Sequence, residues 1–183
     1  MALANYCASG RNERTAYVEV YGHGELSQWK KANDEGFFKE QDVYYYPDYG
    51  KERIAKMLNM DYDRIIMDFG DAYLSHREEI MRCDKKIFLL SLSPWQKFSS
   101  TYLIRTVKNE EWGSIRPVFA SVAASENEIK EVEREFKIEV EQIPIMRNPC
   151  CIPGNVFSEL ENFLDSVPVN EGKRLSFPFR RRV

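Results

Sequence analysis

The stretch that most constrains how this chain can fold is Tyr62–Asp71, which reads YDRIIMDFGD. Its apolar part, Ile65–Met67, shows no polar alternation, and an acid, Asp68, and a glycine, Gly70, follow it. A strand without alternation is buried on both faces, which is typical of a parallel sheet covered by helices. Open α/β sheets bind ligands at the carboxyl ends of their strands. The sequence therefore predicts Asp68 at a ligand-binding edge, where it could hold Mg²⁺ through water and Gly70 would let a phosphate approach the backbone.

The same residues also fit a buried strand that ends on a polar residue without binding a ligand. The rest of the chain has to distinguish this interpretation from a ligand-binding site. At 183 residues the chain is long enough for one domain with a real core. A net charge of −3 gives no basic field and argues against a nucleic-acid partner. The apolar runs are shorter than the ~18 residues of a membrane span, and Met1–Ala4 lacks the basic start of a signal peptide. We therefore expect a cytoplasmic protein without a transmembrane segment.

The cysteines and histidines predict no metal centre and no catalytic residue. The cysteines form no CxxC pair and lie apart from both histidines, so we expect reduced thiols: Cys7, Cys83, Cys150 and Cys151. His23, between two glycines, and His76, in the first turn of a predicted helix, are candidate general bases. Neither has a serine or cysteine in a nucleophile elbow beside it.

Strands and helices are predicted to alternate along the chain. Runs of β-branched, aromatic and other apolar residues predict strands over 15–21, 43–46, 62–68, 87–92, 117–122 and 138–143, the last as an edge strand. Apolar periodicity predicts helices over 1–9, 27–33, 51–59 and 155–167, with Ile54, Met57 and Leu58 facing inward in the third. Three more helices are predicted to begin with capping boxes: Ser75 with Glu78, Ser93 with Gln96, and Ser125 with Glu128.

This alternation predicts the fold class. Repeated strand–helix units force right-handed crossovers, which give a three-layer α/β domain with a mostly parallel sheet and helices on both faces. We assign residues 1–167 to this domain. Residues 168–183 form a basic C-terminal tail, with Lys173, Arg174 and Arg180–Arg182, that could contact an acidic surface; a plain surface tail is the simpler interpretation.

Four stretches, in this order, resemble the ParA/MinD-type ATPases of the SIMIBI class of P-loop proteins. YDRIIMD, ending at Asp68, resembles that family's Walker B segment, YDxIIID. TAYVEVYGHGEL is similar to its second strand and turn, VLLIDLDPQGNL, and CDKKIFLLSLSPWQKFSS to its ADxVIIPVxPxxxSL. IEVEQIPIMRNP is similar to the ending VLGVIPYDP. The resemblance runs over residues 1–165, and the chain closely resembles a degenerate branch found among pilus-assembly and partition-like proteins of Gram-positive bacteria.

Departures from the family pattern affect its nucleotide site. No GxxxxGK[ST] pattern occurs, and residues 1–9 resemble the helix that follows that loop. The resemblance thus implies a P-loop NTPase-like domain without its first strand and P-loop. Of the family's DxD pair, Glu19 keeps the first carboxylate and Tyr21 replaces the second, and Ala123–Ala124 stand where members often carry a base-reading Asn. The remnant of a nucleotide and magnesium site is Asp68, Gly70 and Glu19.

Two functions fit these departures. One is a pseudo-ATPase that does not hydrolyse ATP and acts as a scaffold, with a protein partner or a second copy of itself. The other is a truncated form of a genuine Mg-dependent ATPase of partition or pilus-assembly type, in which ATP and Mg²⁺ would be cofactors only if the loop lies upstream. A third possibility is an unrelated doubly wound domain that shares only the fold.

The missing first strand would leave a gap between strands 62–68 and 87–92. An unpaired buried strand edge is costly, because each orphan amide loses a hydrogen bond worth about 1–3 kcal/mol. We expect the two strands to close up and pair directly. The alternative is a split sheet whose gap is filled by another segment or another chain.

Overall fold

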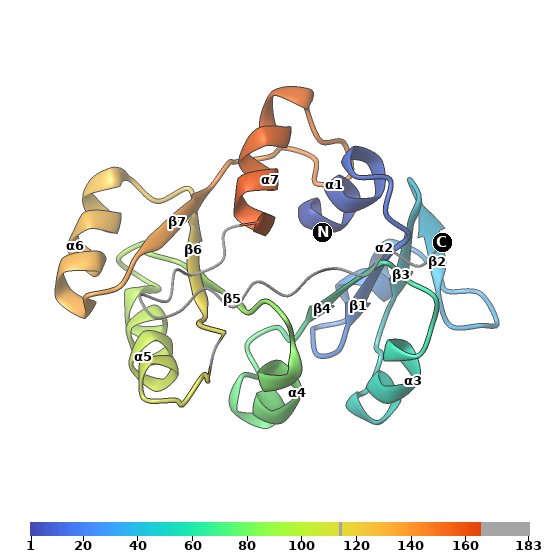
Figure 1. Ribbon diagram of the computed structural model, residues 1–183, viewed down its shortest axis with the longest axis horizontal. Coiled ribbons are helices and arrows are strands. Elements are labelled where there is room, and N and C mark those ends of the chain that lie inside the picture. The colour runs from blue at the N-terminus through green and yellow to red at the C-terminus, as the bar shows by residue number, and fades with distance from the viewer. Residues whose placement is uncertain (114, 166–183) are drawn as a thin grey trace, which may run out of the picture.

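The computed structural model describes residues 1–113 and 115–165, so the predicted tail 168–183 and the end of the domain at 166–167 lie outside the described residues. Helices and strands alternate through most of this part (Figure 1). The strands are β1 (Thr15–Glu19), β2 (Phe38–Glu40), β3 (Val43–Tyr46), β4 (Arg64–Asp68), β5 (Ile87–Leu90), β6 (Val118–Val122) and β7 (Val140–Ile143). The helices are α1 (Ala2–Gly10), α2 (Glu25–Trp29), α3 (Ile54–Leu58), α4 (Arg77–Arg82), α5 (Lys97–Lys108), α6 (Glu126–Phe136) and α7 (Phe157–Asp165).

The strands form two sheets, in the orders β2-β3-β1-β4 and β5-β6-β7. Every pairing is parallel except that of β2 with β3, which is an antiparallel hairpin at the edge. The mostly parallel α/β class is confirmed, and β7 is an edge strand as predicted. The expected direct pairing of the strands now labelled β4 and β5 is wrong: in the part of the chain that the structure describes, no strand pairs with the outer edge of either one.

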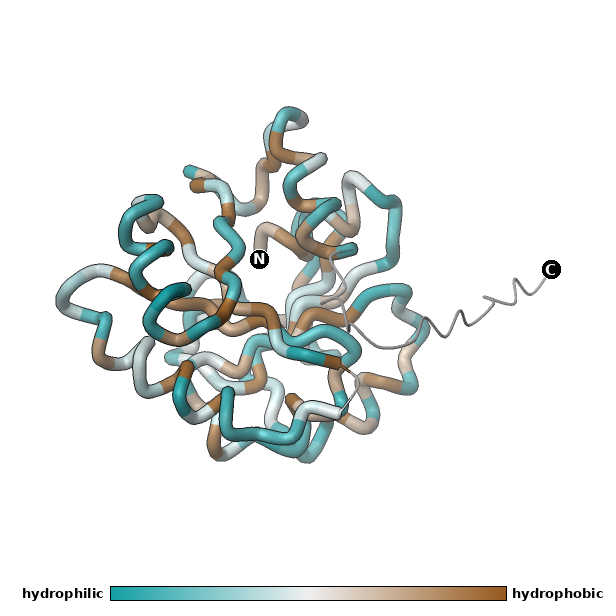
Figure 2. Tube along the Cα trace, turned by 60° about the vertical axis from the view of Figure 1, so that its left-hand side comes forward, coloured by the Kyte–Doolittle hydropathy of each residue, from teal (hydrophilic) through white to brown (hydrophobic). Residues whose placement is uncertain are grey.

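Helices cover both faces of the two sheets and join them. Helices α1 and α7 lie on one side, and α3, α4 and α5 lie on the other (Figure 1). Ala4 and Ala8 pack α1 against the β1–β4 sheet, and Phe163 packs α7 against β6. Tyr6 and Leu160 join the two helices to each other. Hydrophobic stretches follow the strands in the interior, while hydrophilic residues prevail on the outer turns of the helices (Figure 2).

This helix pair gives a physical reason why the strands do not close up. Leu3 of α1 packs in one cluster with Phe163 of α7 and Ile87 of β5, so α1 contacts both halves. Bringing β4 against β5 would require α1 and α7 to give up this packing.

Three element predictions are corrected. Helix α2 begins at Glu25 rather than 27 and ends at Trp29, and Gly36 lies in a separate turn. Strand β2 was missed because its three residues are too few to show alternation. The helix predicted over 51–59 is a 3₁₀ turn, Lys51–Arg53, followed by α3, and Leu58 is exposed rather than inward.

One of the three predicted capping boxes is confirmed. The hydroxyl of Ser125 accepts from the backbone N–H of Glu128, whose carboxylate accepts from the backbone N–H of Ser125. Helix α4 instead starts after a 3₁₀ turn that contains Ser75, with no side-chain cap. Helix α5 starts after a turn in which the carbonyl of Ser93, not its hydroxyl, accepts the backbone N–H of Lys97.

Candidate functional site

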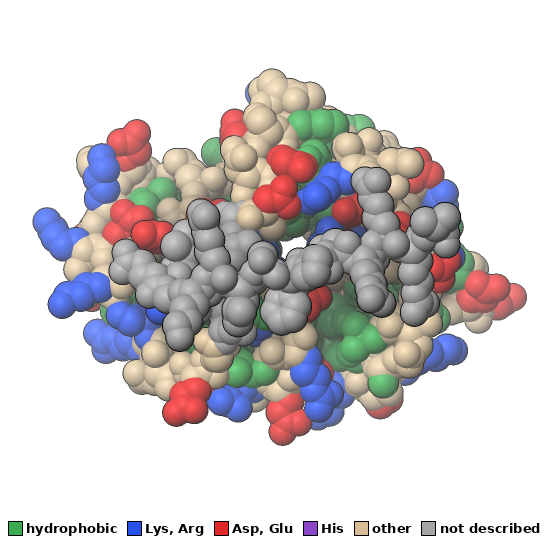
Figure 3. All heavy atoms as spheres, in the orientation of Figure 1, with side chains coloured by type: hydrophobic (Ala, Val, Ile, Leu, Met, Phe, Trp, Pro, Cys, Tyr) green, Lys and Arg blue, Asp and Glu red, His purple; other side chains and the backbone are tan. Residues whose placement is uncertain are grey.

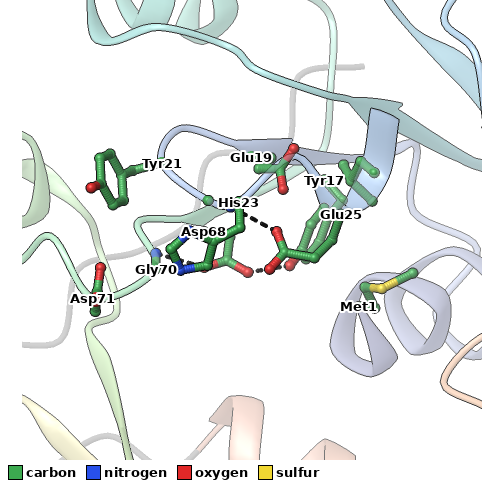
Figure 4. A pocket seen from close by; sticks show the side chains of 11 residues that line it. Met1, Tyr17, Glu19, Tyr21, His23, Glu25, Asp68, Gly70 and Asp71 are labelled. Carbon is green, nitrogen blue, oxygen red and sulfur yellow. Dashed lines mark hydrogen bonds between the residues drawn. The ribbon is translucent and has the colours of Figure 1, made fainter. Parts of the chain in front are cut away.

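A cavity of about 310 Å³ lies at the carboxyl ends of β1 and β4, beside the start of α1 (Figure 4). All three predicted site residues, Asp68, Gly70 and Glu19, line this cavity together. They meet because Glu19 and Asp68 are register partners at the last position of the β1–β4 ladder. The remaining lining residues come from the loop after β1, from α1, β1 and α2, and from beside Gly70: Tyr21, Gly22, His23, Met1, Tyr17, Glu25, Leu26 and Asp71.

Asp68 is held in place by protein hydrogen bonds on both carboxylate oxygens. The hydroxyl of Tyr17 donates to Oδ2, and the backbone N–H of Gly70 donates to Oδ1 at 2.9 Å. Burial, and then the charge of Asp68, raises the pKa of Tyr17 above its ordinary value, so the phenol stays protonated and can donate. The carbonyl of Asp68 also accepts the backbone N–H of Val20 at 2.8 Å, which ties the two strand ends together.

Glu19 is a buried carboxyl group, with 4 % of its surface exposed. Burial raises the pKa of Glu19, and a hydrogen bond shared with Glu25 raises it further. The pKa of Glu25 is lowered, since its carboxylate accepts backbone N–H groups, including that of His23 at 2.9 Å. The two shifts have opposite signs, so Glu19 is the more easily protonated carboxyl group of the pair and Glu25 the more acidic one.

Met1 also lines the cavity, and its amino group is buried within reach of the charge of Asp68. Burial lowers its pKa from 8.0 to about 6, and the nearby charge of Asp68 opposes that shift. At neutral pH this group is therefore largely uncharged, and it adds little positive charge to the cavity.

Gly70 is required by the shape of the loop that follows β4. Its φ is +53°, and a Cβ placed there would lie 2.8 Å from the carbonyl oxygen of Tyr21. A side chain would thus be strained twice, by the backbone conformation and by the contact. The conformation also aims the Gly70 N–H at Asp68, so the glycine serves the position of that carboxylate.

The two candidate histidines are separated. His23 lines the cavity, whereas His76 is buried and packs against the rings of Tyr21 and Phe69, with centroids 6.0 and 5.6 Å away. Among the described residues, Nδ1 of His76 has no hydrogen-bond partner. In the part of the chain that the structure describes, no serine or cysteine lines the cavity with His23.

The described lining residues carry little charge that would neutralise a nucleoside triphosphate. Among the described residues, four carboxyl groups line the cavity, from Glu19, Glu25, Asp68 and Asp71, and no lysine or arginine does. A phosphate chain would meet mostly negative charge there. Within residues 1–113 and 115–165, no three His, Cys, Asp or Glu side chains gather as a metal site would require. Asp68 and Glu19 alone could hold a metal only through water.

Sequence reasoning missed Tyr17, Glu25 and the Met1 amino group as parts of this site. In the sequence, Tyr17 is one of several aromatic residues in a predicted strand. Only the parallel pairing of β1 with β4 places its hydroxyl beside Asp68. Glu25 could have been found from the sequence, because it follows Gly24, and a glycine followed by an acid is a common start of a helix. Gly24 is the N-cap of α2, with φ +75°.

No helix in the described part of the chain is long and apolar enough to cross a membrane.

Comparison with solved structures shows which fold this is. A plasmid partition protein from Borrelia burgdorferi is similar with a TM-score of 0.58 and 12 % identity, over 89 % of this chain and 88 % of that one. A plasmid partition protein from Borrelia burgdorferi B31 bound to AMPPNP gives 0.57 and 12 %, over 89 % of each chain. The MinD cell division protein of Aquifex aeolicus gives 0.52 and 10 %, over 88 % of this chain and 78 % of that one.

These similarities establish a fold like that of ParA-type partition proteins and MinD. The identities are too low to show more than the fold. No protein-family model matches the sequence, and no curated protein sequence matches it.

Proposed function

We propose that this protein is a ParA/MinD-like scaffold that does not hydrolyse ATP and acts through association with a protein partner or a second copy of itself. The observation that supports this function is the charge of the cavity: the described residues that line it bring four carboxyl groups and no lysine or arginine. The fold is retained while the groups that would neutralise phosphate are not among the described residues that line the cavity.

The test is nucleotide turnover and binding by the 183-residue chain. With Mg²⁺ present we expect phosphate release at the level of a protein-free blank and no measurable ATP affinity by calorimetry. Asp68→Asn is the matched variant, because it keeps the shape of the side chain and removes its charge. Turnover above the blank that Asp68→Asn abolishes would overturn the proposal.

A second candidate is a truncated form of a Mg-dependent ATPase of partition or pilus-assembly type. The position of α1 favours it: the helix begins at the carboxyl ends of β1 and β4 and leads into β1, as the crossover from a preceding parallel strand does. Such a strand and a phosphate-binding loop encoded in frame just upstream of Met1 would favour this candidate, and ATP and Mg²⁺ would then be its cofactors. A stop codon directly upstream would exclude it.

The cellular location and the tail belong to the same proposal. A scaffold of this kind would act in the cytoplasm. The basic residues of segment 168–183, which include Lys173 and Arg174, would let it contact an acidic surface.

A further inference from the structure

Three aromatic side chains project from the surface at α5 and at the turn before it. Trp95 is 90 % exposed, Phe98 82 % and Tyr102 59 %. The turn leads into the helix without a break, because the backbone N–H of Lys97 donates to the carbonyl of Ser93 at 2.9 Å. Spacings of three and four residues therefore place the three rings along one side of the helix. We call this row of side chains the aromatic ridge.

The aromatic ridge lies on the side of α5 that faces away from the sheet. The buried residues of the helix include Ile104 and Val107, which belong to the core of the β5–β7 unit. Phe98 and Tyr102 precede Ile104 by six and two residues, which turns them about 120° and 160° away from it around the helix. A strand added between β4 and β5 would join the sheet layer, so it would leave this outer side of α5 uncovered.

The aromatic ridge is large for an exposed apolar feature. At about 200 Å² for each aromatic side chain, the three exposed fractions amount to on the order of 450 Å². Apolar patches of this size on a protein surface mark interaction sites. The tryptophan and tyrosine rings also carry a polar group at one end, which suits a boundary between water and an apolar phase.

The charge of α5 limits what can cover the ridge. The helix carries Lys97, Arg105 and Lys108 and no acid. Lys97 pairs with Glu131 of α6 at 2.7 Å. Arg105 lies over the Phe136 ring at 5.8 Å and Lys108 donates to the Phe136 carbonyl, so within the described residues no carboxylate neutralises either cation. Lys and Arg side chains prevail along the lower left edge of Figure 3, where Figure 1 places α5. A complementary occupant is apolar and negatively charged.

Other parts of this protein fit the ridge poorly. Segment 166–183 has five basic residues and one acidic residue, so it would bring like charge to α5. A second copy that packed its own ridge on this one would oppose two basic helices. A second copy that offered α6 would set charged side chains, such as Glu126 and Lys130, against the rings. An anionic lipid surface supplies the required charge, and its interface accommodates protruding rings without matching pockets.

We propose that the aromatic ridge inserts into the interface of an anionic lipid bilayer, with α5 lying in the plane of the membrane surface. The three rings enter the headgroup region, and Arg105 and Lys108 lie at the level of the lipid phosphates. This inference goes beyond the proposed function, because it adds a lipid-binding surface that does not depend on whether the protein binds ATP.

The probes are vesicles of two compositions, phosphatidylcholine alone and phosphatidylcholine mixed with phosphatidylglycerol. We expect the full chain to co-sediment with the mixed vesicles. Binding to the neutral vesicles should be at least about fivefold weaker, because the attraction between basic side chains and anionic headgroups is lost. Raising the salt concentration to about 1 M shortens the Debye length to about 3 Å, so binding to the mixed vesicles should fall toward the neutral level.

Phe98→Ser tests the ridge itself. It removes one inserted ring from an exposed position, so the fold should persist while binding to the mixed vesicles falls at least about fivefold. Ile145→Ser is the matched control, because Ile145 is 70 % exposed but lies in the loop after β7. This control should change binding by less than about twofold.

Trp95 reports on insertion directly. A version with Trp29→Phe and Trp112→Phe keeps Trp95 as its only tryptophan. With mixed vesicles its emission should move to shorter wavelength and be quenched by brominated lipid. Without vesicles acrylamide should quench it freely, since the side chain is 90 % exposed. Where this version fails to fold, co-sedimentation of the unmodified chain and of Phe98→Ser decides the matter.

Absent binding to the mixed vesicles would overturn the inference and leave a protein partner as the occupant of the ridge. Equal binding to the two compositions would also overturn it. So would equal effects of Phe98→Ser and Ile145→Ser, because another part of the chain would then bind the lipid. Shielding of Trp95 from acrylamide in the free chain would overturn it as well, because the chain itself or a second copy would then cover the ridge. ATP turnover overturns only the proposed function and leaves lipid binding unaffected.

Discussion

At the residue scale, the cavity is organised around the hydrogen bonds of Asp68. Its side chain accepts from Tyr17 and Gly70, and its backbone carbonyl accepts from Val20, so a single residue fixes the ends of both β1 and β4. Charge-assisted hydrogen bonds of this kind are stronger than neutral ones. The position of the Asp68 carboxylate therefore depends on the backbone conformation of Gly70.

We predict that Gly70→Ala destabilises the protein by about 2–3 kcal/mol, through the left-handed conformation and the 2.8 Å contact with the carbonyl of Tyr21. Gly36→Ala is the matched control. Gly36 has φ +84°, and a Cβ added there would meet nothing within 4 Å, so it should lose only about 1 kcal/mol, the conformational part. Urea unfolding gives both free energies, and equal losses would show that the contact with Tyr21 relaxes at no cost.

At the element scale, helix starts are decided by what the preceding turn has to bury. Helix α6 begins where its capping box predicts, after an extended residue at Ser125. Before α4, the 3₁₀ turn Leu74–His76 places the His76 side chain in the interior and moves the helix start two residues beyond Ser75. Tertiary packing thus overrides a local capping signal where a buried side chain competes with it.

We predict that Ser125→Ala costs about 1 kcal/mol of folding free energy, the usual value for an N-cap that bonds the helix. Ser75→Ala is the matched control, because the same substitution there removes no cap and should cost less than about 0.5 kcal/mol. Thermal or urea unfolding of the two variants measures the difference. A loss at Ser75 as large as that at Ser125 would contradict the assignment of a single functional capping box to this pair.

At the scale of the whole molecule, the two sheets form two packing units that α1 and α7 hold together. The core of the β5–β7 unit meets a cluster around β1 through the partly buried Phe69, and Tyr6 and Leu160 lie in one cluster that joins the bridging helices. Among the described residues, no strand pairing joins β4 to β5. Cooperative unfolding of the whole chain therefore depends on helix packing more than in a continuous sheet.

We predict that Leu160→Ala separates the unfolding of the two units. Leu160 is 1 % exposed, and its truncation should cost about 2–5 kcal/mol and weaken the join. Single-tryptophan versions that keep Trp29 in the first unit or Trp112 in the second should then unfold at different urea concentrations. In Ile104→Ala, the matched control, a fully buried side chain inside the second unit is lost and the two probes should still coincide. Coinciding probes in Leu160→Ala would contradict the two-unit description.

The sequence alone determined the alternation of elements, the parallel α/β class and the position of Asp68, Gly70 and Glu19 at strand ends. Periodicity and composition are local, and they correctly predict a strand at Ile65–Met67. The predicted burial on both faces is wrong: all five residues of β4 are half-buried, because a strand pairs with β4 on one side only among the described residues. Apolar inward positions were also legible in part: Ile54 and Met57 are buried, while Leu58 one residue further is exposed. Element ends were less certain, since the residues that decide them contact distant parts of the chain.

Only the tertiary structure decided that the sheet is split and that Tyr17 and Glu25 join the acidic cavity. Both depend on register and on helix packing, which bring together residues far apart in the sequence. From the sequence we predicted that β4 and β5 pair directly, because unpaired backbone amides in the interior cost free energy. The packing of α1 and α7 across both units opposes that closure, and within the described residues the strand edges remain open between them.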